Sequence, residues 1–147
     1  MKIRQLASLF AVLFLITMHG VIAQEQDDIL GVWYNTEKTA KVQITKSGKE
    51  FMGKIVWLLE PERNGVPAMD DQNDDENLRK RPLMGLTILE GLQYKNGTWK
   101  GGKIYDPKSG NTYSCEIKLL SEDVLEVTGY LGFSWIGRTV EWEKAED

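Results

Sequence analysis

Histidine and cysteine are almost absent from this chain of 147 residues. The only histidine, His19, falls in an N-terminal segment that we expect to be removed, so residues 24–147 contain none. Without an imidazole, the chain lacks the usual base of catalytic triads and the commonest ligand of zinc. We therefore expect no enzyme, with no catalytic residues, no cofactor and no metal. Paired carboxylates remain open as an alternative, for which Glu90 or Glu126 would be the acid on an apolar strand face.

Cys115 is the only cysteine, so the chain cannot form an intramolecular disulfide. A nucleophilic role for this thiol would need a base other than histidine. Cys115 alternates with polar neighbours on the same predicted strand face as Tyr113 and Ile117. That pattern favours an inert core residue.

Residues 1–23 have the features of a signal peptide. Lys2 and Arg4 form a positive start, and residues 6–15 are almost wholly apolar. We expect the mature chain to begin near Gln24 and the protein to be exported, either periplasmic or secreted. An uncleaved membrane anchor is the less favoured alternative, because the apolar run is short for a bilayer.

The charge balance is acidic. Loss of the two basic residues in segment 1–23 changes the formal net charge from -4 to -6. This sign disfavours nucleic acid and anionic membrane surfaces as partners, and we expect no stable membrane insertion after cleavage. Residues 24–147 have the length of a single domain with one core.

Short alternating runs separated by turn residues fill most of the mature chain. The clearest pair spans residues 99–120, where Asp106 to Gly110 has the composition of a tight turn. Asn96-Gly97 is a strong hairpin signal that would place Tyr94 opposite Trp99. Eight such runs predict an all-β, eight-stranded antiparallel up-and-down barrel, with a sandwich as the alternative.

One long connection, residues 60–82, interrupts this pattern with a dense acidic cluster. We expect a short helix at 74–79, with acids at its start and bases at its end. Asp71, Asn73 and Asp75 have the spacing that opens a calcium loop, but Glu76 replaces the required glycine. We therefore favour a solvated loop over a metal site.

Arg138 stands among apolar residues on the inward face of the last predicted strand. It either stacks on Trp33 and closes one barrel end, the role we favour, or binds a ligand carboxylate. Inward aromatic residues favour a small, partly apolar ligand. The predicted ligand-binding residues are Trp33, Ile55, Trp57, Tyr113 and Arg138.

A different class of function is also open. Residues 129–135 place several aromatic and aliphatic side chains around one glycine-broken turn, which would form an exposed apolar patch. Together with the acidic segment 60–82, this patch predicts a module that contacts an envelope protein while its barrel is filled with side chains.

Several motifs resemble a known family. Gly31-x-Trp33 with Arg138 is similar to the lipocalin or calycin signature, in which a tryptophan and a basic residue pack across the closed barrel end. The ordered set DxxN (70–73), LRKRPLMGL (78–86), GGKIYDPKSGNTYSC (101–115), GY (129–130) and GRTVEW (137–142) closely resembles secreted bacterial proteins grouped as domain-of-unknown-function family 2147. This resemblance covers essentially the whole mature chain and implies an exported, lipocalin-like barrel. It implies no reaction or ligand.

Overall fold

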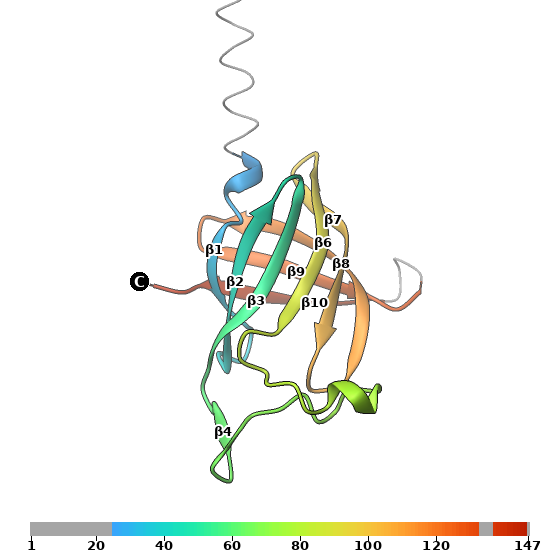
Figure 1. The fold of residues 1–147 in the computed structure, drawn as a ribbon. Helices are drawn as coiled ribbons and strands as arrows, with labels where there is room; N and C mark the ends of the chain where they lie inside the picture. Colours follow the sequence, from blue (N-terminus) through green and yellow to red (C-terminus); the bar gives the residue numbers. More distant parts are fainter. Residues whose placement is uncertain (1–24, 133–136, 147) are drawn as a thin grey trace, which may run out of the picture.

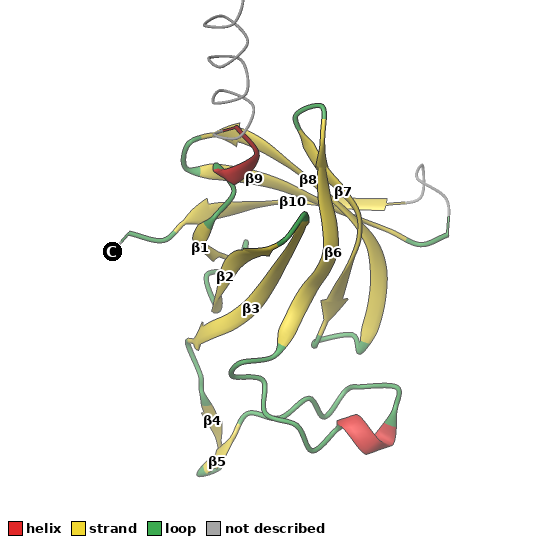
Figure 2. Ribbon diagram, turned by 45° about the horizontal axis from the view of Figure 1, so that its top comes forward, coloured by secondary structure: helices red, strands yellow, loops and turns green. Residues whose placement is uncertain are grey.

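The chain folds into a closed barrel of eight antiparallel strands, which confirms the predicted fold class. The structure is a computed structural model that describes residues 25–132 and 137–146. Figure 1 and Figure 2 show the barrel, in which the strands follow the order β1-β10-β9-β8-β7-β6-β3-β2. Its strands are β1 (Gly31–Tyr34), β2 (Ala40–Ser47), β3 (Glu50–Leu58), β6 (Thr87–Lys95), β7 (Thr98–Asp106), β8 (Asn111–Ser121), β9 (Val124–Tyr130) and β10 (Gly137–Lys144).

Local turn chemistry sets the register of the hairpins. Asn96 and Gly97 both have positive φ, at 52° and 81°, as a two-residue hairpin turn with the strands' twist requires. This turn pairs Tyr94 with Trp99 as predicted, and the two ring centroids lie 5.1 Å apart. In the next turn, the Gly110 N–H donates to the Asp106 carbonyl at 2.8 Å.

One end of the barrel is closed by large side chains and by the N-terminal segment. A helical turn at residues 25–27 and the residues after it lie at this end, beside the β2–β3 and β6–β7 turns (Figure 1). The Trp33 indole N–H donates to the Ile29 carbonyl at 2.9 Å, and that of Trp99 donates to the Gln26 carbonyl at 3.1 Å. Burying these indoles therefore leaves no donor unsatisfied. The core around them also contains Phe51, Leu89, Leu92, Ile117 and Leu125, each fully buried.

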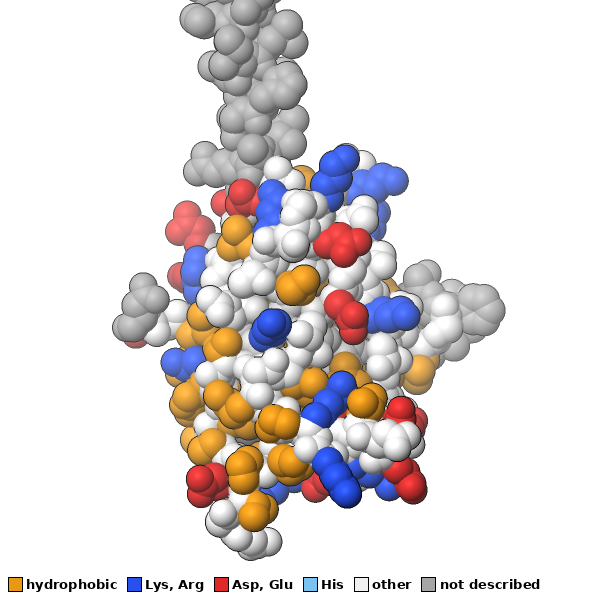
Figure 3. All heavy atoms as spheres, in the orientation of Figure 1, with side chains coloured by type: hydrophobic (Ala, Val, Ile, Leu, Met, Phe, Trp, Pro, Cys, Tyr) orange, Lys and Arg blue, Asp and Glu red, His pale blue; other side chains and the backbone are white. Residues whose placement is uncertain are grey.

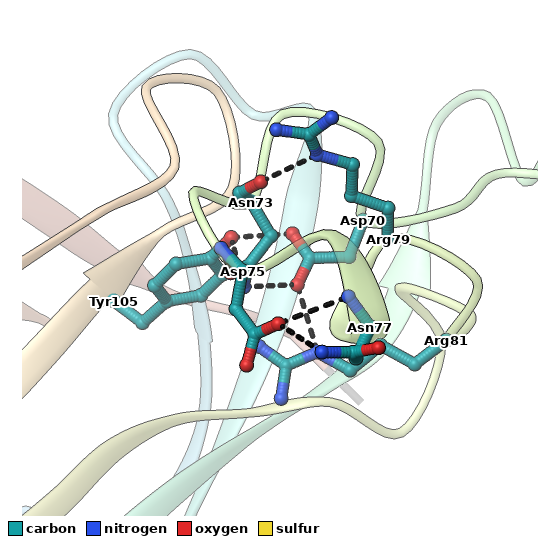
Figure 4. A network of polar contacts seen from close by, with 7 residues as sticks. All are labelled: Asp70, Asn73, Asp75, Asn77, Arg79, Arg81 and Tyr105. Carbon is teal, nitrogen blue, oxygen red and sulfur yellow. Dashed lines mark hydrogen bonds and ion pairs between the residues drawn. The ribbon is translucent and has the colours of Figure 1, made fainter.

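The long connection between β3 and β6 is organised around a buried carboxylate. Asp70 is 0% exposed and accepts hydrogen bonds from the Tyr105 hydroxyl, the Arg81 Nε and the Asn73 amide (Figure 4). The expectation of a solvated loop is therefore wrong for Asp70 and Asn73. The other acids of the cluster are exposed, as expected. Burial is tolerated because each carboxylate oxygen has a partner.

The predicted helix at 74–79 is also wrong in extent. The segment forms only a 3-10 turn, Glu76–Leu78, after a two-stranded hairpin of β4 (Glu62–Arg63) and β5 (Val66–Pro67). Side chains compete with helical bonding here: Asn73 Oδ1 accepts from the Asp75 N–H, and Asp75 Oδ1 accepts from the Asn77 N–H. Among the residues described, no helix is long and apolar enough to cross a membrane.

Candidate ligand-binding cavity

A cavity of about 610 Å³ occupies the half of the barrel away from the N-terminal segment. Its walls are mostly aliphatic and come from the seven strands β2, β3, β6, β7, β8, β9 and β10, because inward positions alternate along each strand. The rim includes four exposed residues: Glu37 in the β1–β2 loop, Lys108 in the β7–β8 loop, Leu131 just after β9 and Arg138 at the start of β10. The apolar wall residues are Val42, Ile55, Ile88, Ile104, Val127, Val140 and Trp142.

Two tyrosines add polar groups to this wall. Tyr105 is 8% exposed, and its hydroxyl donates to Asp70 Oδ1 at 2.5 Å while accepting from the Asn73 amide at 3.0 Å. Burial, followed by the hydrogen bond to Asp70, raises the pKa of Tyr105 to about 12. The hydroxyl of Tyr113 lies 3.4 Å from Ser109 Oγ. Tyr105 therefore joins the cavity wall to the buried network of the long connection.

One ion pair joins two of the four charged residues at the rim. Lys108 forms an ion pair with Glu37 across the β7–β8 and β1–β2 loops. Asp106 Oδ1 accepts from the Lys108 backbone N–H at 3.0 Å and so stabilises the turn. Within residues 25–132 and 137–146, no carboxylate forms an ion pair with Arg138.

The comparisons with known proteins agree with this architecture. Residues 31–144 match the model of a family described as "Uncharacterized protein conserved in bacteria (DUF2147)". The chain belongs to the DUF2147 family. This DUF2147 chain is also similar to a solved structure, protein HP1028 from Helicobacter pylori, which is described as belonging to the lipocalin family.

The similarity to HP1028 has a TM-score of 0.70 at 22% sequence identity and covers 81% of this chain and 84% of that chain. At this identity the likeness shows the fold alone, so the DUF2147 chain is a lipocalin-like barrel. A comparison with curated proteins gave no match.

The segments that carry the family resemblance meet in space. Asp70 and Asn73 come from DxxN, Arg81 from LRKRPLMGL, and Tyr105 and Gly110 from GGKIYDPKSGNTYSC. The first four join in the hydrogen-bonded network of Figure 4. Gly110 makes the close approach possible, since a Cβ at this position would lie 1.9 Å from the Gln72 carbonyl oxygen. These motifs therefore attach the long connection to the barrel beside the cavity.

Three of the five predicted binding residues line the cavity: Ile55, Tyr113 and Arg138. Trp33 does not, because it is fully buried in the core of the closed end. Trp57 does not either, because a β-bulge in β3 changes the side on which it lies. Val42 pairs with Ile55 but Lys41 pairs with Trp57, so Val56 is the extra residue.

As a result, Trp57 lies on the outer face with Tyr34 and Lys41. The two aromatic rings meet edge to face at 6.0 Å, and the Lys41 ammonium lies 5.6 Å from the Trp57 ring centroid.

The favoured stack of Arg138 on Trp33 is wrong. The cation over Trp33 is Lys144, whose Nζ lies 5.5 Å from the ring centroid. Strand β1 is short and pairs with the C-terminal end of β10, so Trp33 stands opposite Lys144. Arg138 lies six residues earlier in β10, about 20 Å along the strand, at the cavity rim.

Sequence reasoning missed several lining residues. Val127 and Val140 occupy paired inward positions, and alternation alone could have identified them. Tyr105 could not be singled out in this way, because its partner Asp70 is 35 residues away in the sequence. Two aromatic residues of the proposed interaction patch, Phe133 and Trp135, lie outside the described residues.

Cys115 is buried at 3% exposure, as predicted. Burial raises the pKa of this thiol to about 12, so the reactive thiolate is strongly disfavoured at neutral pH. Among the described residues, no three His, Cys, Asp or Glu side chains are grouped as a metal site would require.

Proposed function

We propose that the protein binds a small, partly apolar molecule inside its barrel. The observation that carries this proposal is the cavity of about 610 Å³ with an aliphatic wall and a few polar groups. Ligand sites typically enclose about 300 to 1,000 Å³ with this kind of lining. Eight-stranded barrels either fill their interior with side chains or hold one small ligand.

Binding rather than catalysis is the role we assign to this cavity. Residues 24–147 contain no histidine, and the pKa of the single thiol is raised to about 12. Of the two tyrosine hydroxyls in the wall, that of Tyr105 is already bonded to Asp70, and that of Tyr113 lies 3.4 Å from Ser109 Oγ. The residues therefore offer shape and polarity rather than an activated nucleophile.

Native mass spectrometry of gently purified protein, followed by titration with apolar ligands, tests the proposal. We expect a one-to-one complex and a change in the fluorescence of Trp142, which lines the cavity. Val140→Trp should fill the cavity and abolish binding. Thr139→Trp, on the outer face of the same strand, is the matched control and should still bind. Equal binding by both variants would reject the site.

We also propose that the protein is exported before it binds its ligand. The support is the pattern of residues 1–23, with Lys2 and Arg4 preceding an apolar run. Cell fractionation with N-terminal sequencing tests this. We expect a form beginning near Gln24 in the periplasm or medium, and a cytoplasmic form that retains Met1 would contradict it.

A second candidate is an interaction module that docks on an envelope protein. It is favoured by apolar side chains gathered near the β4–β5 hairpin (Figure 3), where Leu59, Val66 and Met84 are 58%, 57% and 42% exposed. The open cavity counts against the filled barrel that this candidate assumes. Val66→Ser should weaken association with a purified partner without lowering the melting temperature, and unchanged association would reject this surface.

A further inference from the structure

Arg138 is an inward-facing cation at the rim of a cavity whose wall is mostly aliphatic. On β10 it is followed at alternate positions by Val140 and Trp142, which also line the cavity. The β9 partners of those two residues, Val127 and Leu125, are 2% and 0% exposed, so this face of the ladder points into the barrel. Alternation places the Arg138 side chain on the same face, at its exposed end.

The position opposite Arg138 has no side chain. Its β9 partner is Gly129, which also lines the cavity. A Cβ on Gly129 would stand 3.4 Å from Tyr113 Cβ and 3.6 Å from Ile104 Cγ2. The wall beside Gly129 is therefore formed by an aromatic residue of the adjacent strand β8 and an aliphatic residue of β7, and the β9 position paired with Arg138 carries no carboxylate.

Each of the other charged side chains at the rim has a partner, which is an ion for Glu37 and Lys108 and a backbone N–H for Asp106. Glu37 is paired with Lys108, and Asp106 accepts a hydrogen bond from the Lys108 backbone N–H. In the part of the chain that the structure describes, Arg138 is thus the rim cation that no carboxylate neutralises. A guanidinium offers planar, paired donors that match a carboxylate.

We propose that the ligand is a linear amphiphile with a carboxylate head. The head binds Arg138 at the rim, and the apolar tail extends toward Trp142, which is four residues or about 13 Å further along β10. This inference rests on the proposed function, because it assigns a chemical class and an orientation to the ligand of that cavity. Val127 and Val140 would contact the tail.

Three probes share the same tail and differ in the charge of the head group: dodecanoate, dodecanol and dodecyltrimethylammonium, each used below its critical micelle concentration. Comparing them separates the contribution of the head group to binding from that of the tail. We expect dodecanoate to bind most tightly to the wild type. Arg138→Gln should weaken the binding of dodecanoate by about tenfold, which is the scale of one charge-assisted contact. It should leave the affinity for dodecanol unchanged. Arg138→Lys should retain part of the affinity for dodecanoate that Arg138→Gln loses. Added salt should weaken the binding of dodecanoate but not that of dodecanol.

Lys49→Gln is the matched control, because this exposed cation lies in the β2–β3 turn at the closed end. It should leave all three dissociation constants unchanged. If dodecanol binds as tightly as dodecanoate and Arg138→Gln has no effect, the head-group assignment is wrong while the cavity proposal stands. If no probe binds, the cavity proposal itself fails and takes this inference with it.

Discussion

The Tyr105 hydroxyl donates a 2.5 Å hydrogen bond to the Asp70 carboxylate, and this bond attaches the long β3–β6 connection to the barrel wall. Tyr105→Phe would leave one oxygen of a fully buried carboxylate without this donor. We expect a loss of about 1–3 kcal/mol in the free energy of unfolding, measured by urea denaturation. Asp71→Asn, at an exposed position of the same loop, should change it by less than about 0.5 kcal/mol. Equal effects would contradict the network.

Tyr105 should also give the protein a specific alkaline response. Burial and the bond to Asp70 raise its pKa from 10.0 to about 12 in the folded state. The folded state therefore prefers the neutral phenol, and this stabilisation is complete below pH 10 and is lost as pH rises toward 12. The difference in unfolding free energy between wild type and Tyr105→Phe should be constant up to about pH 10 and shrink above it. A difference that grows with pH would reverse the sign and contradict the assignment.

Gly110 should be far less replaceable than another glycine with a similar backbone. Its φ is +75°, and a Cβ would lie 1.9 Å from the Gln72 carbonyl oxygen. Gly48 has φ +61° with nothing within 4 Å of a Cβ, so Gly48→Ala measures the backbone cost alone, about 1 kcal/mol. Gly110→Ala should cost more and should increase proteolysis within residues 60–82. Equal melting temperatures and equal cleavage would count against the close contact.

The stability of the closed end should depend much more on Trp33 than on Lys144, the cation over its ring, or on Arg138, the cation at the cavity rim. Trp33→Ala should lower the unfolding free energy by about 3–5 kcal/mol, and Trp33→Phe keeps the experiment informative if that variant does not fold. Lys144→Ala should cost about 0.5–1 kcal/mol, as for an exposed cation over an aromatic ring. Arg138→Ala should be close to neutral and additive with Trp33→Phe. Measurable coupling between Trp33 and Arg138 would contradict the observed register.

Cys115 should resist thiol reagents until the barrel opens. It is 3% exposed, and burial raises its pKa to about 12. At neutral pH we expect negligible labelling by a chromogenic disulfide reagent in buffer and complete labelling in denaturant. Rapid labelling of the native protein would show that this strand opens locally.

The fold could be predicted because its signals are local. Alternation sets which face each residue occupies, and pairs such as Asn96-Gly97 set the hairpin register within a few residues. The same logic placed Ile55 and Tyr113 correctly on the cavity wall. It failed at Trp57, because a single extra residue in β3 reverses the face of everything after it and leaves no clear mark in the sequence.

The remaining errors come from contacts between distant segments. Arg138 and Lys144 have the same parity on one strand, and only the overlap of β1 with β10 decides which of them meets Trp33. In the sequence, nothing distinguishes Asp70 from the other acidic residues of the polar segment 60–82. Its burial depends on donors from Arg81 and Tyr105, and neither the strand pattern nor the loop composition indicates that pairing.

The two indole bonds at the closed end have a mechanical consequence. Trp33 stands on β1 and Trp99 on β7, four strands apart in a ring of eight, so the segment that they hold is bonded to opposite walls of the barrel. Strands β1 and β10 share only two residue pairs, which is the shortest ladder in the wall. Tension applied ahead of residue 25 would be divided between opposite walls instead of peeling β1 away from β10. The cavity rim, at the far end, would carry almost none of that force.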